Sequence, residues 1–103
     1  MKPSRKIDFA RINARALASA DSILVRWLPD GRREGTEWVA LNPRRSDKRR
    51  GSFKVNLHTG KWGDFAAGAS GGDLVSLAAY LFDLGQGEAA LKVSDMLGVD
   101  PHV

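Results

Sequence analysis

Cysteine is absent from this sequence of 103 residues, and His58 and His102 are its only histidines. Without cysteine the chain can form neither disulfides nor the thiolate sites that hold structural zinc. Two histidines are too few for a site that normally takes four cysteine or histidine ligands. The composition therefore excludes a disulfide-stapled fold and gives no basis for a metal site or for any other cofactor.

Long apolar runs are missing as well. No stretch approaches the roughly 20 apolar residues that span a bilayer. The basic N-terminus leads into Asp8 rather than into the apolar core of a signal peptide. We therefore expect a soluble, cytoplasmic protein with no membrane partner. The length fits a single domain over residues 1–103, with residues 1–6 as a flexible leader.

No catalytic motif stands out. The sequence has no HExxH motif and no paired carboxylate cluster, and Ser52, Ser70 and Ser76 have no evident base to activate them. A magnesium site shared by Asp64 and Asp73 is the weakest of the candidates. We expect that the chain by itself is not an enzyme.

Positive charge is concentrated in the first two thirds of the chain. Residues 1–65 carry 15 Lys/Arg and 7 Asp/Glu, a formal charge of +8, whereas residues 66–103 carry 1 and 5, a formal charge of −4. Such asymmetry favours a polyanionic partner, above all nucleic acid. The alternative is a solvated basic face that serves only solubility.

Helical periodicity dominates the N-terminal part of the chain. Apolar residues recur at spacings of three and four from Phe9 to Trp27. The spacing predicts one long helix over about residues 8–28. Pro29 and Gly31 end it, because proline cannot continue the hydrogen-bond ladder and glycine tolerates positive φ.

Alternating apolar and polar residues follow in the middle of the chain and predict a three-stranded antiparallel meander. The turn at Thr59-Gly60 joins the second and third strands as a hairpin. Residues 32–35 are expected to form a polar turn, and residues 66–72 a loop of small residues. The three predicted strands cover residues 36–41, 52–57 and 61–65.

Two further helices are predicted after the sheet. Asp73 is a good N-cap for an apolar helix over residues 74–82, and capping is favoured over a phosphate site at the amides after Gly71-Gly72. The last helix starts at Gln86 or Gly87 and ends at Gly98. The fold class is therefore α+β: a long N-terminal helix, a three-stranded antiparallel sheet and two C-terminal helices.

Five cations lie within seven residues of the loop after the first predicted strand. Arginine binds phosphate through two parallel hydrogen bonds, and an anion would relieve the repulsion among the clustered charges. We predict phosphate contacts here, with a solvated loop as the alternative. Arg32 and Arg33 join this surface if their turn lies beside the loop. The loop cations are Arg44, Arg45, Lys48, Arg49 and Arg50.

The predicted hairpin adds cations interleaved with aromatic residues. Lys54 and Lys61 would extend the phosphate track, and Trp62 is the candidate for stacking on a base. Aromatic residues at strand spacing belong more often to a core, which is the favoured interpretation for Phe53 and Phe65.

Several short motifs follow one another between residues 39 and 99. A Ser-Phe strand start at Ser52-Phe53 precedes an aromatic stretch over residues 62–67 and a Gly-Gly-Asp helix opening that ends at Asp73. Glu88-Ala89-Ala90 and Leu97-Gly98 complete the series. In this order the motifs resemble the zinc-ribbon domain at the N-terminus of bacterial and phage DNA primases and primase-helicases. The resemblance covers about 60% of the chain and leaves the N-terminal helix outside it.

The resemblance is to a degenerate, zinc-less form of that domain, of the kind found in primase-like proteins of phages and mobile elements. The family holds zinc with a Cys-Pro-x-His element and a Cys-x-x-Cys pair. In this sequence Asn42, Arg45, Asp64 and Ala67 occupy the four ligand positions. All four ligands are replaced, so zinc is not expected to bind.

The resemblance also implies a function. The family's ribbon domain contacts template DNA, whereas the polymerising chemistry belongs to a separate domain that has no counterpart here. The chain is therefore expected to bind DNA, most simply single-stranded template, as a non-catalytic accessory domain in replication or primer synthesis. The rival interpretation is a protein-interaction module that docks onto a replicative polymerase, primase or helicase through apolar pieces such as Trp27, Trp38 and residues 74–82.

Overall fold

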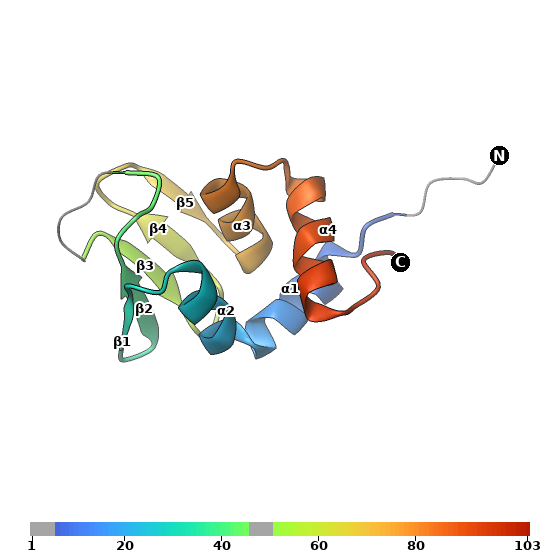
Figure 1. Ribbon diagram of the computed structural model, residues 1–103, viewed down its shortest axis with the longest axis horizontal. Coiled ribbons are helices and arrows are strands. Elements are labelled where there is room, and N and C mark those ends of the chain that lie inside the picture. The colour runs from blue at the N-terminus through green and yellow to red at the C-terminus, as the bar shows by residue number, and fades with distance from the viewer. Residues whose placement is uncertain (1–5, 46–50) are drawn as a thin grey trace.

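The computed structural model describes residues 6–45 and 51–103, and within these it contains four helices and five strands. In Figure 1 the strands lie at one end of the molecule, and α4 and the C-terminus lie towards the other. The helices are α1 (Phe9–Ala18), α2 (Ala20–Trp27), α3 (Leu74–Phe82) and α4 (Gln86–Leu97). The strands are β1 (Arg32–Glu34), β2 (Glu37–Ala40), β3 (Phe53–Asn56), β4 (Trp62–Asp64) and β5 (Ala69–Gly71).

The sheet is an antiparallel meander in the order β1-β2-β3-β4-β5. The predicted three strands are confirmed as β2, β3 and β4, but the sheet is larger than expected. Residues 32–34, predicted as a turn, form edge strand β1, and residues 69–71, predicted as a loop, form edge strand β5. Both edges are three residues long and bury no side chain, so backbone pairing with a neighbour, rather than an apolar pattern, defines them.

The single long N-terminal helix was a wrong prediction, because the chain breaks into two helices at Ser19. Ser19 adopts φ −117° and ψ 26°, and its N–H bonds to the carbonyl of Ala16 at the end of α1. The buried stripe nevertheless continues across the break through Ile12, Ala16, Ala20 and Ile23. This continuity explains why the apolar spacing alone indicated one helix.

One face of the sheet contributes to the core. Phe53 and Val55 are fully buried on β3, and the ring of Tyr80 in α3 lies 6.3 Å from that of Phe53 between centroids. On β2, the indole Nε1 of Trp38 donates to the carbonyl of Leu28, the residue that follows α2 (3.1 Å). The helix α1 packs against α3 and α4. The interior is therefore one continuous core between the sheet and the four helices.

The ends of the C-terminal helices agree with the predictions. Asp73 caps α3, since its Oδ1 accepts from the N–H of Ser76 (2.8 Å) and the Ser76 hydroxyl completes a capping box. The helix α4 ends at Gly98, whose φ of 69° favours glycine. Among the described residues, no helix combines the length and apolarity needed to cross a bilayer.

Candidate nucleic-acid interface

Cations lie on the face of the sheet opposite the core. Side chains alternate along a strand, so Lys54 faces away from its buried neighbours Phe53 and Val55. Arg32 on β1 and Lys54 on β3 both pair with Val39 of β2, which places all three side chains on this outer face. Lys61, next to buried Trp62, follows the same alternation. Neither lysine forms an ion pair with a described residue.

A groove with a volume of about 510 Å³ runs over this outer face. Its floor is Gly63, which lies between Lys54 and Ser70 in the strand register and has no side chain to fill the space. Phe65 lines the groove, and the residue is 84% exposed. We call this feature the sheet groove; its lining includes Glu37, Lys54, Asn56, Lys61, Trp62, Gly63 and Phe65.

The structure reverses the expected roles of two aromatic residues. Trp62, the candidate for base stacking, is only 7% exposed. Its indole Nε1 donates to the hydroxyl of Ser76 (2.9 Å), and its ring centroid lies 5.0 Å from that of Tyr80. Phe65, expected in the core, lies just beyond the end of β4 and faces solvent. The aromatic surface that can stack on a base is therefore that of Phe65, not that of Trp62.

Arg44 lies on the side of the sheet where α3 ends. Its guanidinium carbon is 5.6 Å from the ring centroid of Tyr80, and its Nη1 is 3.7 Å from a carboxylate oxygen of Asp83. The side chain remains 40% exposed. A partly exposed guanidinium held by one solvated carboxylate is available to exchange that partner for a phosphate.

Arg45 has a structural partner instead. Its Nη1 donates to both carboxylate oxygens of Asp64, at 3.3 and 3.2 Å, and Asp64 is only 1% exposed. The Nδ2 of buried Asn42 donates to the same carboxylate (2.7 Å) and to the hydroxyl of Tyr80 (2.8 Å). The backbone N–H of Ala66 adds a further bond of 2.9 Å. We call Asn42, Arg45 and Asp64 the Asp64 network.

Two opposing effects set the pKa of Asp64. Burial by itself would raise the pKa, because it penalises the charged form. Hydrogen bonds from Asn42, the Ala66 backbone, Ser52 and Arg45 favour the carboxylate and outweigh burial. The pKa of Asp64 is therefore held below its ordinary value, and the side chain is ionised at neutral pH.

The four positions that the motif resemblance aligns with zinc ligands meet at this one carboxylate. Asn42 and Arg45 bind Asp64 through their side chains, and the N–H of Ala67 lies 3.3 Å from Asp64 Oδ1. A magnesium site shared with Asp73 does not fit this arrangement, since Asp64 is enclosed and Asp73 caps α3. Within residues 6–45 and 51–103, no group of three His, Asp or Glu side chains is placed to hold a metal.

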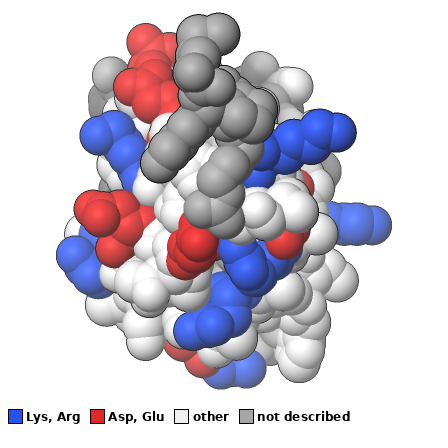
Figure 2. Space-filling view, turned by 90° about the vertical axis from the view of Figure 1, so that its right-hand side faces the viewer, with Lys and Arg blue, Asp and Glu red and all other residues white. Residues whose placement is uncertain are grey.

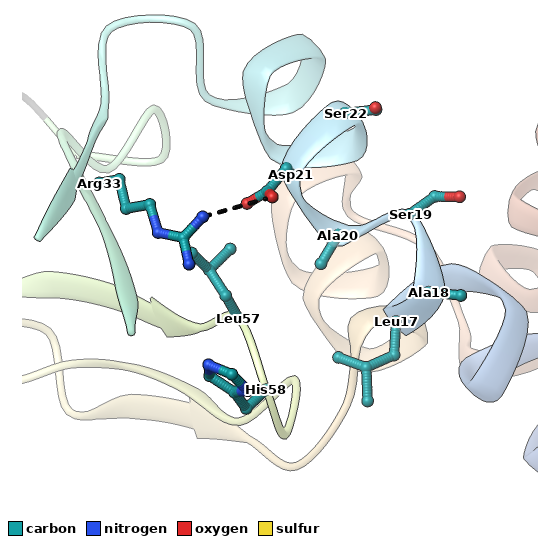
Figure 3. A pocket seen from close by; sticks show the side chains of 9 residues that line it. All are labelled: Leu17, Ala18, Ser19, Ala20, Asp21, Ser22, Arg33, Leu57 and His58. Atoms are coloured by element: carbon teal, nitrogen blue, oxygen red, sulfur yellow. Dashed lines mark ion pairs between the residues drawn. The ribbon is translucent and has the colours of Figure 1, made fainter. Parts of the chain in front are cut away.

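The two arginines of β1 point to opposite faces. Arg32 lies on the outer face, where its Nε binds the carboxylate of Glu34 (2.9 Å). Arg33 reaches towards α2, and its Nη1 lies 3.5 Å from Asp21 (Figure 3). This pair lines a cleft of about 340 Å³ beside the break between α1 and α2. Arg33 is thus separated from the sheet groove, whereas Arg32 shares its face.

The remaining predicted contacts are Lys48, Arg49 and Arg50, which lie outside the described residues. Figure 2 shows the end of the molecule opposite the sheet. There several Lys and Arg side chains adjoin one another in the centre and lower part of the view, with Asp and Glu among them. The outer face of the sheet is the candidate interface because it combines Lys54, Lys61 and exposed Phe65 with a groove.

Neither a family model nor a curated protein matches the sequence. The fold is similar to that of the Aquifex aeolicus primase, in a crystal structure of its zinc-binding and RNA polymerase domains. The TM-score is 0.71 at 19% identity, over 92% of this chain and 22% of that chain. This chain therefore spans about a fifth of the length of the primase chain that it matches. The resemblance predicted from the motifs is confirmed at the level of the fold, and the chain, having no cysteine, lacks the thiolate zinc ligands.

Proposed function

We propose that this chain is a nucleic-acid-binding accessory domain that acts in DNA replication or primer synthesis. It binds single-stranded template DNA, is cytoplasmic, and carries out no catalysis by itself. The likeness of its fold to a primase supports the setting. A primase or another replication protein would supply the chemistry as its partner.

The observation that carries this proposal is the sheet groove. Lys54 and Lys61 border it without ion-pair partners among the described residues, and Phe65 is an aromatic residue that is 84% exposed. Proteins that bind single strands combine such a cationic track with aromatic rings on which bases stack. Arg32 lies on the same face and can add a phosphate contact. Arg44, in the segment that follows β2, can add another.

Binding should depend strongly on salt. With four to six phosphates neutralised, the logarithm of the binding constant should fall against that of the salt concentration with a slope of roughly −3 to −4, at about 0.7 per phosphate. Fluorescence anisotropy of a labelled single strand measures this slope. The double variant Lys54→Gln/Lys61→Gln should make the slope shallower by about 1.4.

The matched control is Arg15→Gln/Arg26→Gln, which removes two cations from α1 and α2. It should leave the slope unchanged, because these residues belong to helices that pack on the core side of the sheet, opposite the sheet groove. Equal slopes for wild type and the lysine variant would contradict the assignment of Lys54 and Lys61. No binding even at low salt would contradict the proposed function itself.

A second candidate function rests on an apolar surface at the helices. Trp27 of α2 and Phe82 of α3 meet edge to face at 5.7 Å and line a groove of about 270 Å³ together with Met96 of α4. Phe82 is 51% exposed. Exposed apolar patches often mark sites where another protein binds. The docking module would be favoured if the chain captures a replication protein, if this capture persists after nuclease treatment, and if the Phe82→Ala variant no longer captures that protein.

A further inference from the structure

The two edges of the sheet differ in their protection against further strands. The edge strand β1 (Arg32–Glu34) consists of charged, exposed residues. Charged side chains along an edge strand hinder its pairing with another strand. The opposite edge, β5, consists of Ala69, Ser70 and Gly71, and none of these carries a charge. The edge at β5 is therefore the one that can accept another strand.

The alternation of hydrogen bonds determines which backbone groups β5 offers. The N–H of Asn56 donates to the carbonyl of Lys61 (2.7 Å), so every second residue from Lys61, including Gly63, directs its backbone groups to β3. Gly63 therefore has no backbone group left for Ser70, its register partner on β5. The N–H and C=O of Ser70 point away from the sheet, and no residue in the described ranges bonds to them.

Beyond β5 lies a shallow surface depression with a volume of about 500 Å³, between this strand and α3. We call it the edge shelf; its apolar lining comes from Trp62, Ala79, Tyr80 and Leu84. Ser70 pairs with Gly63 and so faces the outer side of the sheet, whereas the shelf lies on the side of α3. In a strand paired with Ser70, the residues on either side of the paired one would turn their side chains towards the shelf.

We propose that β5 and the edge shelf bind an extended segment of a partner protein, which adds a strand to the sheet and lays a large apolar side chain on the shelf. The free donor and acceptor of Ser70 are complementary to the backbone of an extended segment. A helical segment bonds its own backbone groups and cannot supply them. This proposal stands independently of the proposed DNA binding.

A second copy of this chain is a poorer occupant of the same edge. If its β5 paired with Ser70, Ala69 and Gly71 of that copy would face the shelf, and a methyl group and a hydrogen atom are too small to fill it. If its β1 paired there, charged side chains would cover an apolar lining, which is unfavourable. The size and the polarity of the shelf therefore favour a segment with a large apolar residue.

The test begins with a display library of random short peptides, selected on the full chain. Selected peptides should carry large apolar residues at alternate positions. Fluorescence anisotropy of a labelled selected peptide should show at least about 10-fold weaker binding to Ser70→Pro, because proline removes the N–H and leaves a peptide carbonyl unpaired.

The matched control is Arg33→Pro on the other edge. Arg33 is the outward-facing residue of β1 by the same alternation, so proline there should leave peptide binding unchanged. Proline is tolerated where an edge strand directs its N–H to solvent. Circular dichroism melting of both variants shows whether they are folded.

Methylated forms of the selected peptide test strand pairing without altering the protein. Methyl groups on alternate amide nitrogens should abolish binding in one of the two registers and spare it in the other, because only one edge of the peptide faces β5. Equal effects in both registers would refute strand addition.

The remaining outcomes also decide against the proposal. It is refuted if the library yields no binding peptide, if binding survives in Ser70→Pro, or if Arg33→Pro weakens binding as much as Ser70→Pro does. Peptides that still bind Ser70→Pro but not Phe82→Ala would occupy the groove at Trp27 and Phe82, and the assignment to β5 would be wrong.

Discussion

Replacing Asp64 with alanine is expected to lower the free energy of unfolding by about 3 kcal/mol. The variant removes the charge that Arg45 and Asn42 bind and leaves the N–H of Ala66 without its acceptor. Losing one partner of a buried ion pair costs about 3–5 kcal/mol. Arg45 is 34% exposed and can turn to water, which favours the lower end. For a domain of this size the melting temperature should fall by about 12–24 °C, measured by circular dichroism or calorimetry.

Asp83→Asn is the matched control for this experiment. Asp83 also faces an arginine, but its side chain is 88% exposed, and asparagine tolerates its left-handed backbone (φ 55°), so the loss of its charge should change stability by less than about 0.5 kcal/mol. Lowering the pH should destabilise the wild type, as the Asp64→Ala substitution does. Folding lowers the pKa of Asp64, so its contribution is complete above about pH 4 and is lost as the pH falls through the folded-state pKa. Melting temperatures of wild type and Asp64→Ala should therefore converge in acid; a constant difference would contradict this account.

Phe65→Ala is expected to weaken binding of single-stranded DNA by about 5- to 150-fold, the range that loss of one base–aromatic stack produces. The ring is exposed, so stability should hardly change. The salt slope should also stay the same, because no cation is removed. Anisotropy with a labelled single strand at several salt concentrations separates these quantities.

Phe82→Ala provides the control for a lost exposed phenylalanine. Phe82 lies at the end of α3, beside Trp27, and does not line the sheet groove. DNA affinity should therefore be unchanged in this variant. If both substitutions weaken binding equally, or neither does, Phe65 has no special role, and the stacking surface must be sought elsewhere.

Elements with strong local chemistry were predictable from the sequence. The alternation around Phe53 and Val55 identified the central strands, and Asp73 with Gly98 identified helix ends, because these signals are carried by neighbouring residues. The break at Ser19 was not predictable in this way, since the buried stripe runs straight through it. The edge strands were also missed, because their pairing partners, not their own side chains, make them strands.

The site was predictable in part. Lys54 and Lys61 lie on a common face, as strand alternation requires, whereas Arg32 and Arg33 prove to be on opposite faces because they belong to a strand rather than a turn. Phe65 was assigned to the core because aromatic residues at strand spacing usually belong to one. In the structure it follows the alternation of β4, two residues after Gly63 on the outer face, and therefore faces solvent.

The chemistry of the Asp64 network determines which solution conditions destabilise this fold. A corner tied by thiolates and a metal fails when a chelator takes the metal or an oxidant attacks the sulfur. The corner formed by Asn42, Arg45 and Asp64 contains only carboxylate, amide and guanidinium groups, which neither agent removes. Its weakness is acid instead, because protonation of one carboxylate cancels the charge that holds the corner together. The corner is thus insensitive to metal supply and to thiol oxidation, and it is sensitive to low pH.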